Sequence, residues 1–213
     1  MTPRPPAQSS NTLRNLGEVA TNIILATLFT LFAYAAYLSW RDAGHIQMLL
    51  LAIQETIIVW LLISRRRTRD SSTSWSDWLV AILGTAAPLL QRAGDTPFPQ
   101  LEVAGTAIQV FATGLSVLAT ISLGRSFGIV AANRGVQTGG LYRFVRHPLY
   151  GSYSIGYIGF LLGNPTLMNI ALIAVSFTCQ YLRAVAEERV LARDPAYQQY
   201  LTQVRYRFIP YIF

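Results

Sequence analysis

The chain has little of what proteins use to bind transition metals or to form disulfides. Its 213 residues contain one cysteine, two histidines and no lysine. The single cysteine, Cys179, cannot form a disulfide within the chain, and its place in an apolar run suits a packing role. With so few histidine and cysteine ligands, we expect no metal site.

Charge is also scarce, and all of the positive charge is arginine. Only 13% of the residues are charged, about half the share of an ordinary soluble domain. The formal net charge of +7 would suit a nucleic-acid-binding protein, yet the arginines lie between apolar segments. Membrane topology explains that placement, so no nucleic-acid partner is expected.

Phosphate-binding loops of the common kinds are missing. No Gly-x-Gly-x-x-Gly segment follows a predicted strand, and there is no Walker-type loop. The segment 124–128, Gly-Arg-Ser-Phe-Gly, is too short and too rich in arginine to count as one. The glycine-rich segment 135–140 is better interpreted as the loop before the one histidine in the second half of the chain.

Long apolar runs are what the chain does contain. Hydrophobic residues make up 52% of the sequence, in runs too long and uniform for one globular core. A helix needs about 20 such residues to cross a bilayer. The last two runs flank Asn164-Pro165, a turn signal, and are short enough to form a short helical hairpin. We predict an all-α, polytopic transmembrane helix bundle with about six apolar segments: 19–38, 46–63, 75–90, 103–123, 149–163 and 167–182.

The distribution of arginine predicts the topology of this bundle. If the N-terminus is cytoplasmic, the cytoplasmic segments hold fifteen arginines and the outer loops hold only Arg41 and Arg92. This strong positive-inside bias predicts that both termini are cytoplasmic. We therefore expect a multi-pass protein of an inner or plasma membrane, with membrane lipids as its surroundings.

Beyond residue 182 the chain changes character. Residues 183–192 are expected to continue as a charged helix. Asp194-Pro195 is a good helix start, with Asp194 as N-cap and Pro195 in the first turn. Apolar and aromatic residues then recur at helical spacing, which predicts a C-terminal amphipathic helix at the membrane interface.

The first candidate site is the segment Arg146-His147-Pro148-Leu149-Tyr150. Pro148 suits the first turn of a helix and keeps His147 out of helical geometry. The free backbone N–H groups at such a helix start can bind an anion, for example a carboxylate. A purely topological interpretation is open as well, because arginine and tyrosine decorate any cytoplasmic membrane interface.

Acidic residues provide the other candidates. Glu187 and Glu188 lie one turn after Arg183, and either they bind a cationic or hydroxylated group, or Glu187 simply pairs with Arg183 on a wet helix. Glu55 lies in the middle of the second apolar segment, where an acid is either functional or hydrogen-bonded between helices. Gly84, Gly105 and Gly114 are expected to permit close helix contact.

The C-terminal part of the chain resembles the isoprenylcysteine carboxyl methyltransferase family, whose core signature is shared by phospholipid N-methyltransferases. The resemblance covers about the last ninety residues, from 123 to the end. It rests on the order of Gly140-Leu141-Tyr142-Arg143-Phe144-Val145-Arg146-His147-Pro148-Leu149-Tyr150, a helical hairpin, Glu187-Glu188, Tyr197, Tyr200 and Arg207-Phe208-Ile209-Pro210. One departure is clear, because the family's Tyr-x-Gly would place glycine at position 152, where this chain has Gly151-Ser152.

The resemblance implies a membrane enzyme that uses S-adenosylmethionine (SAM). It implies that Arg183 meets the methyl acceptor and acts as the catalytic residue. Together with composition, it predicts three parts: a flexible cytoplasmic N-terminus (1–16) and N-terminal transmembrane helices (17–123), both expected from composition alone, and a cofactor-binding methyltransferase core (124–213), which the resemblance covers. The residues it places around SAM are Gly140, Tyr142, His147, Pro148, Tyr150, Glu187 and Glu188.

The expected reaction is methyl transfer from SAM to a lipophilic acceptor that reaches the site from the bilayer. Carboxyl methylation of an isoprenylcysteine-type substrate fits best, because a carboxylate is ionised at neutral pH and needs no strong base. A phospholipid, a small amine or a thiol are alternative acceptors. A transporter using Glu55 and Glu102, or a scaffold binding anionic lipid, are rival functions. A pocket beside His147 would favour the enzyme, and one beside Glu55 the transporter.

Overall fold

The computed structural model describes residues 8–44, 46–64, 66, 70–72, 74–92 and 98–211. The first seven residues, His45 and several arginines between the second and third helices therefore lie outside the described part of the chain. The first helix begins at Gln8, inside the segment 1–16 that composition predicts to be flexible.

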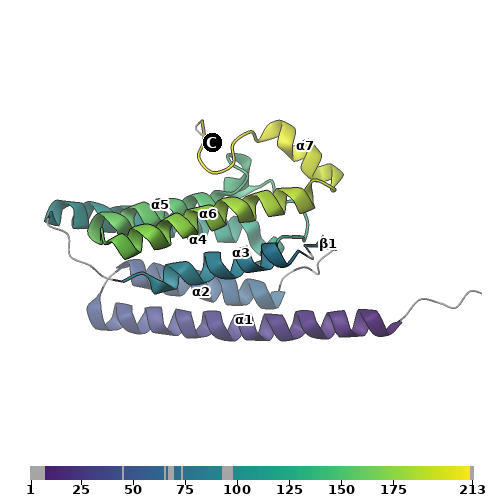
Figure 1. Ribbon diagram of the computed structural model, residues 1–213, viewed down its shortest axis with the longest axis horizontal. Helices are drawn as coiled ribbons and strands as arrows, with labels where there is room; N and C mark the ends of the chain where they lie inside the picture. The colour runs from purple at the N-terminus through teal and green to yellow at the C-terminus, as the bar shows by residue number, and fades with distance from the viewer. Residues whose placement is uncertain are drawn as a thin grey trace, which may run out of the picture.

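The described chain is almost entirely helical, as predicted for an all-α bundle (Figure 1). Three short 3-10 turns connect the helices: η1 (Ala87–Leu90), η2 (Gly124–Ser126) and η3 (Gly140–Arg143). A two-stranded antiparallel ladder joins β1 (Asp70–Ser71) to β2 (Ala132–Asn133). The α-helices are α1 (Gln8–Ala43), α2 (Ile46–Ser64), α3 (Trp75–Ala86), α4 (Pro99–Leu123), α5 (Pro148–Gly163), α6 (Leu167–Leu191) and α7 (Pro195–Gln203).

Length and hydropathy identify the helices that can cross a bilayer. Three described segments are long and apolar enough, namely Asn22–Asp42, Pro99–Ser126 and Leu167–Leu191. Helix α5, with 16 residues, is short, as expected for one arm of the last hairpin. The other arm is longer than its apolar part, because α6 continues as a charged helix to Leu191, as predicted.

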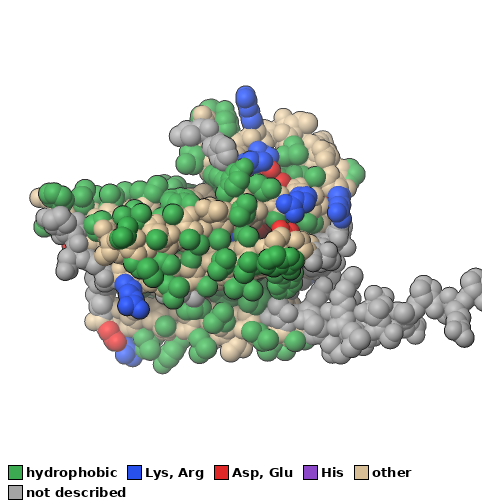
Figure 2. All heavy atoms as spheres, viewed as in Figure 1, with side chains coloured by type: hydrophobic (Ala, Val, Ile, Leu, Met, Phe, Trp, Pro, Cys, Tyr) green, Lys and Arg blue, Asp and Glu red, His purple; other side chains and the backbone are tan. Residues whose placement is uncertain are grey.

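Helices α1 to α6 run side by side, and the chain alternates between the two ends of the bundle (Figure 1). The start of α1, the β1–β2 ladder and α7 all lie at one end. On the face drawn in Figure 2, hydrophobic side chains cover the middle of the helices and charged ones gather toward the ends. This is the surface of an integral membrane protein.

Two groups of helices build the bundle. Helix α1 packs on α2, and α4 packs on both α2 and α5, while α3 packs mainly on α6. Buried apolar residues join α2 and α4 to the first turn of α5 and the loop before it: Ile58, Leu61, Leu62, Ala119, Phe127 and Leu149. Because Leu149 follows the His147-Pro148 pair directly, this core fixes the position of the first candidate site.

Glycines allow the closest helix contact, between α4 and α5. A Cβ atom at Gly105 would lie 2.4 Å from the carbonyl oxygen of Gly159, and one at Gly159 would lie 2.7 Å from that of Gly105. At Gly84 a Cβ atom would lie 3.0 Å from the Cβ of Cys179 on α6. The expectation of close contact is therefore confirmed at Gly84 and Gly105. It is wrong for Gly114, where an added Cβ atom would have no described atom of another segment within 4 Å.

Local sequence signals fix the helix ends near the candidate site. Asp194 caps α7 as predicted, its side chain accepting a hydrogen bond from the N–H of Ala196 at 3.0 Å. Pro148 is the first residue of α5, and its missing N–H costs nothing at that position. The turn predicted at Asn164-Pro165 is present, followed by Thr166 as the N-cap of α6.

Replacing Gly159 with alanine tests the glycine contact. The new Cβ would collide with backbone of α4, so we expect Gly159→Ala to lower the free energy of unfolding by about 1–3 kcal/mol. Gly114→Ala, on the open side of α4, is the matched control and should be neutral or slightly stabilising. Thermal unfolding in detergent measures both variants, and equal effects would contradict the contact.

Candidate active site

The Arg146-His147-Pro148 turn is held from two sides. His147 has φ −132° and ψ 63°, outside helical geometry, as expected for the residue before a proline that begins a helix. The N–H groups of Arg146 and His147 donate to the carbonyls of Tyr206 and Arg207, at 2.9 and 2.8 Å. The C-terminal segment thus pairs with this turn and fixes its backbone.

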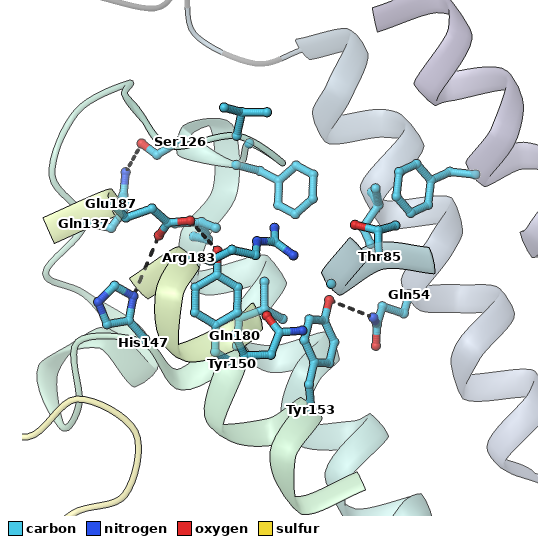
Figure 3. A pocket seen from close by; sticks show the side chains of 18 of the residues that line it. Gln54, Thr85, Ser126, Gln137, His147, Tyr150, Tyr153, Gln180, Arg183 and Glu187 are labelled. Carbon is cyan, nitrogen blue, oxygen red and sulfur yellow. Dashed lines mark hydrogen bonds and ion pairs between the residues drawn. The ribbon is translucent and has the colours of Figure 1, made fainter. Parts of the chain in front are cut away.

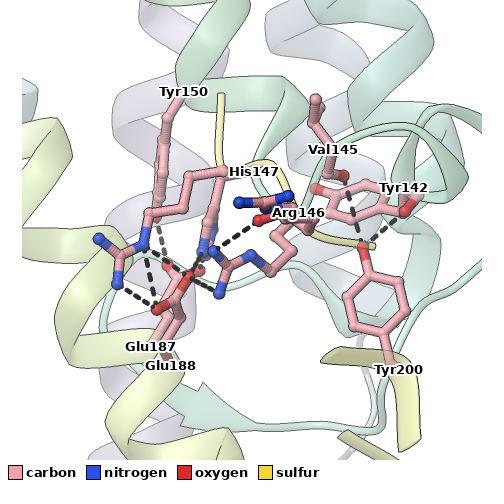
Figure 4. Close-up of polar contacts among 10 residues, drawn as sticks. Tyr142, Val145, Arg146, His147, Tyr150, Glu187, Glu188 and Tyr200 are labelled. Atoms are coloured by element: carbon pink, nitrogen blue, oxygen red, sulfur yellow. Dashed lines mark hydrogen bonds and ion pairs between the residues drawn. The ribbon is translucent and has the colours of Figure 1, made fainter. Parts of the chain in front are cut away.

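Glu188 on α6 binds the charged groups around that turn (Figure 4). Its carboxylate accepts hydrogen bonds from Arg207, the shortest being 2.8 Å, and pairs with Arg146 at 3.0 Å. The Nε2 atom of His147 lies 3.3 Å from the same carboxylate. The hydrogen bond to Glu188 raises the pKa of Arg207. Glu188 therefore ties together α6, the turn and the C-terminal segment.

Glu187 lies on the other side of the histidine ring. The hydroxyl of Tyr150 donates to its carboxylate, and His147 Nδ1 lies 3.7 Å from it. The rings of His147 and Tyr150 stack with centroids 5.7 Å apart and planes 12° from parallel. His147 is only 5% exposed. The histidine is therefore placed between two acids that the sequence puts next to each other.

Arg183 lies one turn before Glu187 and faces the same tyrosine (Figure 3). Its guanidinium sits over the ring of Tyr150, 5.0 Å from the centroid, and donates to the carbonyl of Ile129 at 3.0 Å. Its Nε atom is buried without a hydrogen-bond partner. No ion pair within 4.0 Å joins Arg183 to Glu187 in the described chain, so simple pairing along the helix is not what the structure shows.

A cavity of about 590 Å³ opens beside these residues, a size typical of small-molecule sites. One end is polar and includes the candidate residues His147, Tyr150, Arg183 and Glu187. The other end lies between α1, α2 and α3 and is mainly apolar; we call it the apolar limb. Its apolar lining is Phe29, Phe32, Ala35, Ala36, Met48, Leu51, Ile58 and Pro88, and its polar lining is Ser39, Gln54, Glu55 and Thr85.

The position of the cavity does not by itself decide between the enzyme and the transporter predicted from the sequence. It reaches His147, as the enzyme interpretation requires, and it also reaches Glu55, which the transporter interpretation uses. One continuous space therefore joins the polar cluster at the end of the bundle to the membrane-embedded helices.

The predicted site residues divide into two groups in the structure. Five of them line the cavity, namely Tyr142, His147, Tyr150, Arg183 and Glu187. The other three, Gly140, Pro148 and Glu188, are not among the residues that line it. Gly140 has φ +58°, and a Cβ atom there would lie 2.3 Å from the hydroxyl of Ser122, so glycine is required for the turn. Pro148 begins α5, and Glu188 contacts Arg146, His147 and Arg207, so both support the cavity wall without lining it.

Sequence reasoning missed several lining residues. The end of η2 contributes Ser126, the segment after β2 contributes Arg134 and Gln137, and α7 contributes Tyr197 and Tyr200. The hydroxyl of Tyr200 donates to the carbonyl of Tyr142 at 2.5 Å, which joins α7 to the cavity wall. Irregular loops carry no periodic signal, so only the tyrosine pair, already part of the resemblance, could have been found beforehand.

The packing around Gly151 and Ser152 shows why this chain can depart from the signature at position 152. A Cβ atom at Gly151 would lie 2.6 Å from the carbonyl oxygen of Phe208, so the C-terminal segment packs directly on this glycine. Ser152 is 1% exposed, and its hydroxyl donates to the carbonyl of Leu149 at 2.7 Å. Both positions therefore require small residues, and serine satisfies its own hydroxyl.

Comparison with known proteins supports the methyltransferase part of the resemblance. Residues 101–198, a little under half of the chain, match the family model described as phospholipid methyltransferase. The matched region runs from α4 into α7 and contains His147, Tyr150, Arg183, Glu187 and Glu188. The match indicates a membrane methyltransferase. No curated protein matches the chain. Among the described residues, no group of three or more histidine, cysteine, aspartate or glutamate side chains is placed to hold a metal ion.

Removing the charge of Glu188 should loosen the C-terminal segment. We expect Glu188→Gln to lower the free energy of unfolding by about 2 kcal/mol, because hydrogen bonds to charged groups are lost. Trypsin should then cleave the segment after Arg205 and Arg207 faster.

Arg189→Gln is the matched control. Arg189 follows Glu188 on α6 and is 62% exposed. It lies 3.7 Å from Asp77, beyond hydrogen-bond distance, so we expect its loss to change stability little. Equal protection from trypsin in wild type and Glu188→Gln would contradict the role given to Glu188.

Proposed function

We propose that the protein transfers a methyl group from SAM to a lipophilic acceptor that reaches the cavity from the bilayer. The proposal rests on one observation: the same cavity has a polar end and an apolar limb. The polar end contains four of the seven residues that the resemblance assigns to the cofactor: Tyr142, His147, Tyr150 and Glu187. The apolar limb lies among membrane helices, where an acceptor with a hydrocarbon chain finds its usual surroundings.

The residues at the polar end fit SAM by their chemistry. The amino group and ribose hydroxyls of SAM can donate hydrogen bonds to the carboxylate of Glu187. The carboxylate of SAM can pair with the Arg146 guanidinium or accept hydrogen bonds from the backbone N–H groups at the start of α5. When bound, SAM supplies an electrophilic methyl group on sulfur.

The chain's own contribution is positioning and exclusion of water. Methyl transfer requires the acceptor atom in line with the bond that breaks, so held geometry supplies much of the rate. Tyr150 is fixed by Glu187 below its hydroxyl and by Arg183 above its ring. Arg183 faces the cavity between the polar end and the limb, where its guanidinium can orient the polar group of an acceptor.

Two acceptor classes have specific support. Carboxyl methylation of an isoprenylcysteine-type substrate is supported by Arg183, which suits a carboxylate, and by the resemblance of the core. A phospholipid acceptor is supported by the description of the family model that matches residues 101–198. Both acceptors are amphiphiles, and both would place their chains in the apolar limb.

We also propose that the polar end of the cavity faces the cytoplasm. Many of the described arginines lie at that end of the bundle, while Arg41 in the last turn of α1 and Arg92 just after η1 lie at the opposite end. An excess of arginine on the cytoplasmic side is the usual pattern of membrane proteins.

Binding of S-adenosylhomocysteine to the purified protein tests the cofactor assignment. We expect His147→Ala and Glu187→Gln each to weaken binding about tenfold or more in calorimetry, because each removes a polar contact of the cavity. Arg183→Ala should keep cofactor binding and lose methyl transfer. Retained transfer in Arg183→Ala would remove the acceptor role of that residue.

Arg143→Ala serves as the control. Arg143 lies in η3, stacks on Phe144 and does not line the cavity, so this variant should bind like the wild type. If the wild type binds no S-adenosylhomocysteine, either in detergent or in native membranes, the proposed function is wrong.

A further inference from the structure

Glu55 is the one acidic group that the cofactor assignment leaves unused inside the cavity. Along α2 the residues Met48, Leu51, Glu55 and Ile58 follow helical spacing and all line the apolar limb. Glu55 therefore replaces one apolar residue in an otherwise apolar stripe. It lies in a helix that the phospholipid methyltransferase match, residues 101–198, does not include.

The carboxylate of Glu55 lacks the partners that its neighbour has. Gln54 accepts a hydrogen bond from Ser116 and lies 3.4 Å from the hydroxyl of Tyr153, so it joins α2 to α4 and α5. In the described part of the chain, Oε2 of Glu55 is shielded from solvent and has no hydrogen-bond partner. No ion pair with Glu55 occurs among the described residues. Gln54 thus has a structural role that Glu55 does not share.

An unpartnered acid in such a place is costly. Burying a carboxyl group without a hydrogen bond or a cation is unfavourable, and more so within membrane helices. The limb also contains the polar side chains of Ser39, Gln54 and Thr85, but Glu55 Oε2 has no hydrogen bond to a described residue, which leaves it open to a ligand. The partner that satisfies a carboxylate best is a cationic hydrogen-bond donor.

Arg183 is less free to select an acceptor by charge. It already donates to the carbonyl of Ile129 and lies over the ring of Tyr150. Of Arg183 and Glu55, the cation is therefore already partly satisfied and the acid is not. This balance favours an acceptor whose polar group is positive over one whose polar group is a carboxylate.

We propose that Glu55 is a specificity-determining residue that binds an ammonium group on the lipophilic acceptor. The proposal deepens the function proposed above and rests on it for the meaning of the bound molecule. Glu55 would hold the amine-bearing end of the acceptor in the limb, with its chain along Met48, Leu51 and Ile58. Before transfer the bound ammonium gives one proton to the Glu55 carboxylate, which frees the nitrogen lone pair to take the methyl group as its bond to the SAM sulfur breaks. A carboxylate acceptor would instead meet the Glu55 carboxylate as a like charge.

Binding of three short probes to protein in nanodiscs tests this assignment, with empty nanodiscs as the blank. We expect the wild type to bind octylamine about tenfold more tightly than octanoate, which has the same chain length. Ethylamine should bind much more weakly than octylamine, because it leaves the apolar limb unfilled. Tight binding of ethylamine would point to a free small amine as the ligand and would contradict a lipophilic one.

Variants then locate the preference. Glu55→Gln should lose the preference for octylamine, while Glu102→Gln, an exposed acid at the start of α4 outside the cavity, should keep it. Unchanged octylamine binding in Glu55→Gln would overturn the proposal. If that variant does not fold, the wild type still decides, since equal or tighter binding of octanoate contradicts the role of Glu55.

S-adenosylhomocysteine binding, measured in the same samples, separates the two proposals. A wild type that binds this cofactor product but shows no preference for octylamine contradicts only the assignment of Glu55. A wild type that prefers octylamine but does not bind S-adenosylhomocysteine contradicts the methyltransferase function and leaves an amine-binding cavity.

Discussion

The contact on which the site depends is the carboxylate of Glu188 with two arginines and a histidine around it. Arg146 and His147 come from a turn and Arg207 comes from the C-terminal segment, and Glu188 alone contacts all three. The acid is 14% exposed, so these contacts are only partly screened by water. Glu188 does not line the cavity, yet it holds the histidine that does.

Once that contact is made, the neighbouring groups have few positions left. His147 is placed between Glu188 and Glu187, and Glu187 in turn takes the hydroxyl of Tyr150. Tyr150 presents its other side to Arg183, which leads from the polar end toward the apolar limb. His147, Glu187, Tyr150 and Arg183 all line this cavity, so the proposed enzyme has a cofactor end and an acceptor end within one space.

Much of this could be predicted from the sequence, because local rules decide it. Pro148 and Asp194 determine where α5 and α7 begin, and the apolar runs predict the membrane helices. Glu187 and Glu188 are adjacent on α6, so the sequence alone places them near each other. The contacts of Arg183 could not be predicted, since its carbonyl partner, Ile129, lies 54 residues away in an irregular loop. Gly114 was misjudged for the same reason, because a glycine shows its neighbours only in the fold. The meaning of Glu55 also required the cavity.

A crystal structure of the protein grown with S-adenosylhomocysteine tests the central claim most directly. The account predicts the ligand at the polar end of the cavity, against His147, Tyr150 and Glu187, with its sulfur turned toward Arg183 and the apolar limb. A ligand bound instead in the smaller pocket between α3 and α6, or within the limb beside Glu55, would contradict it.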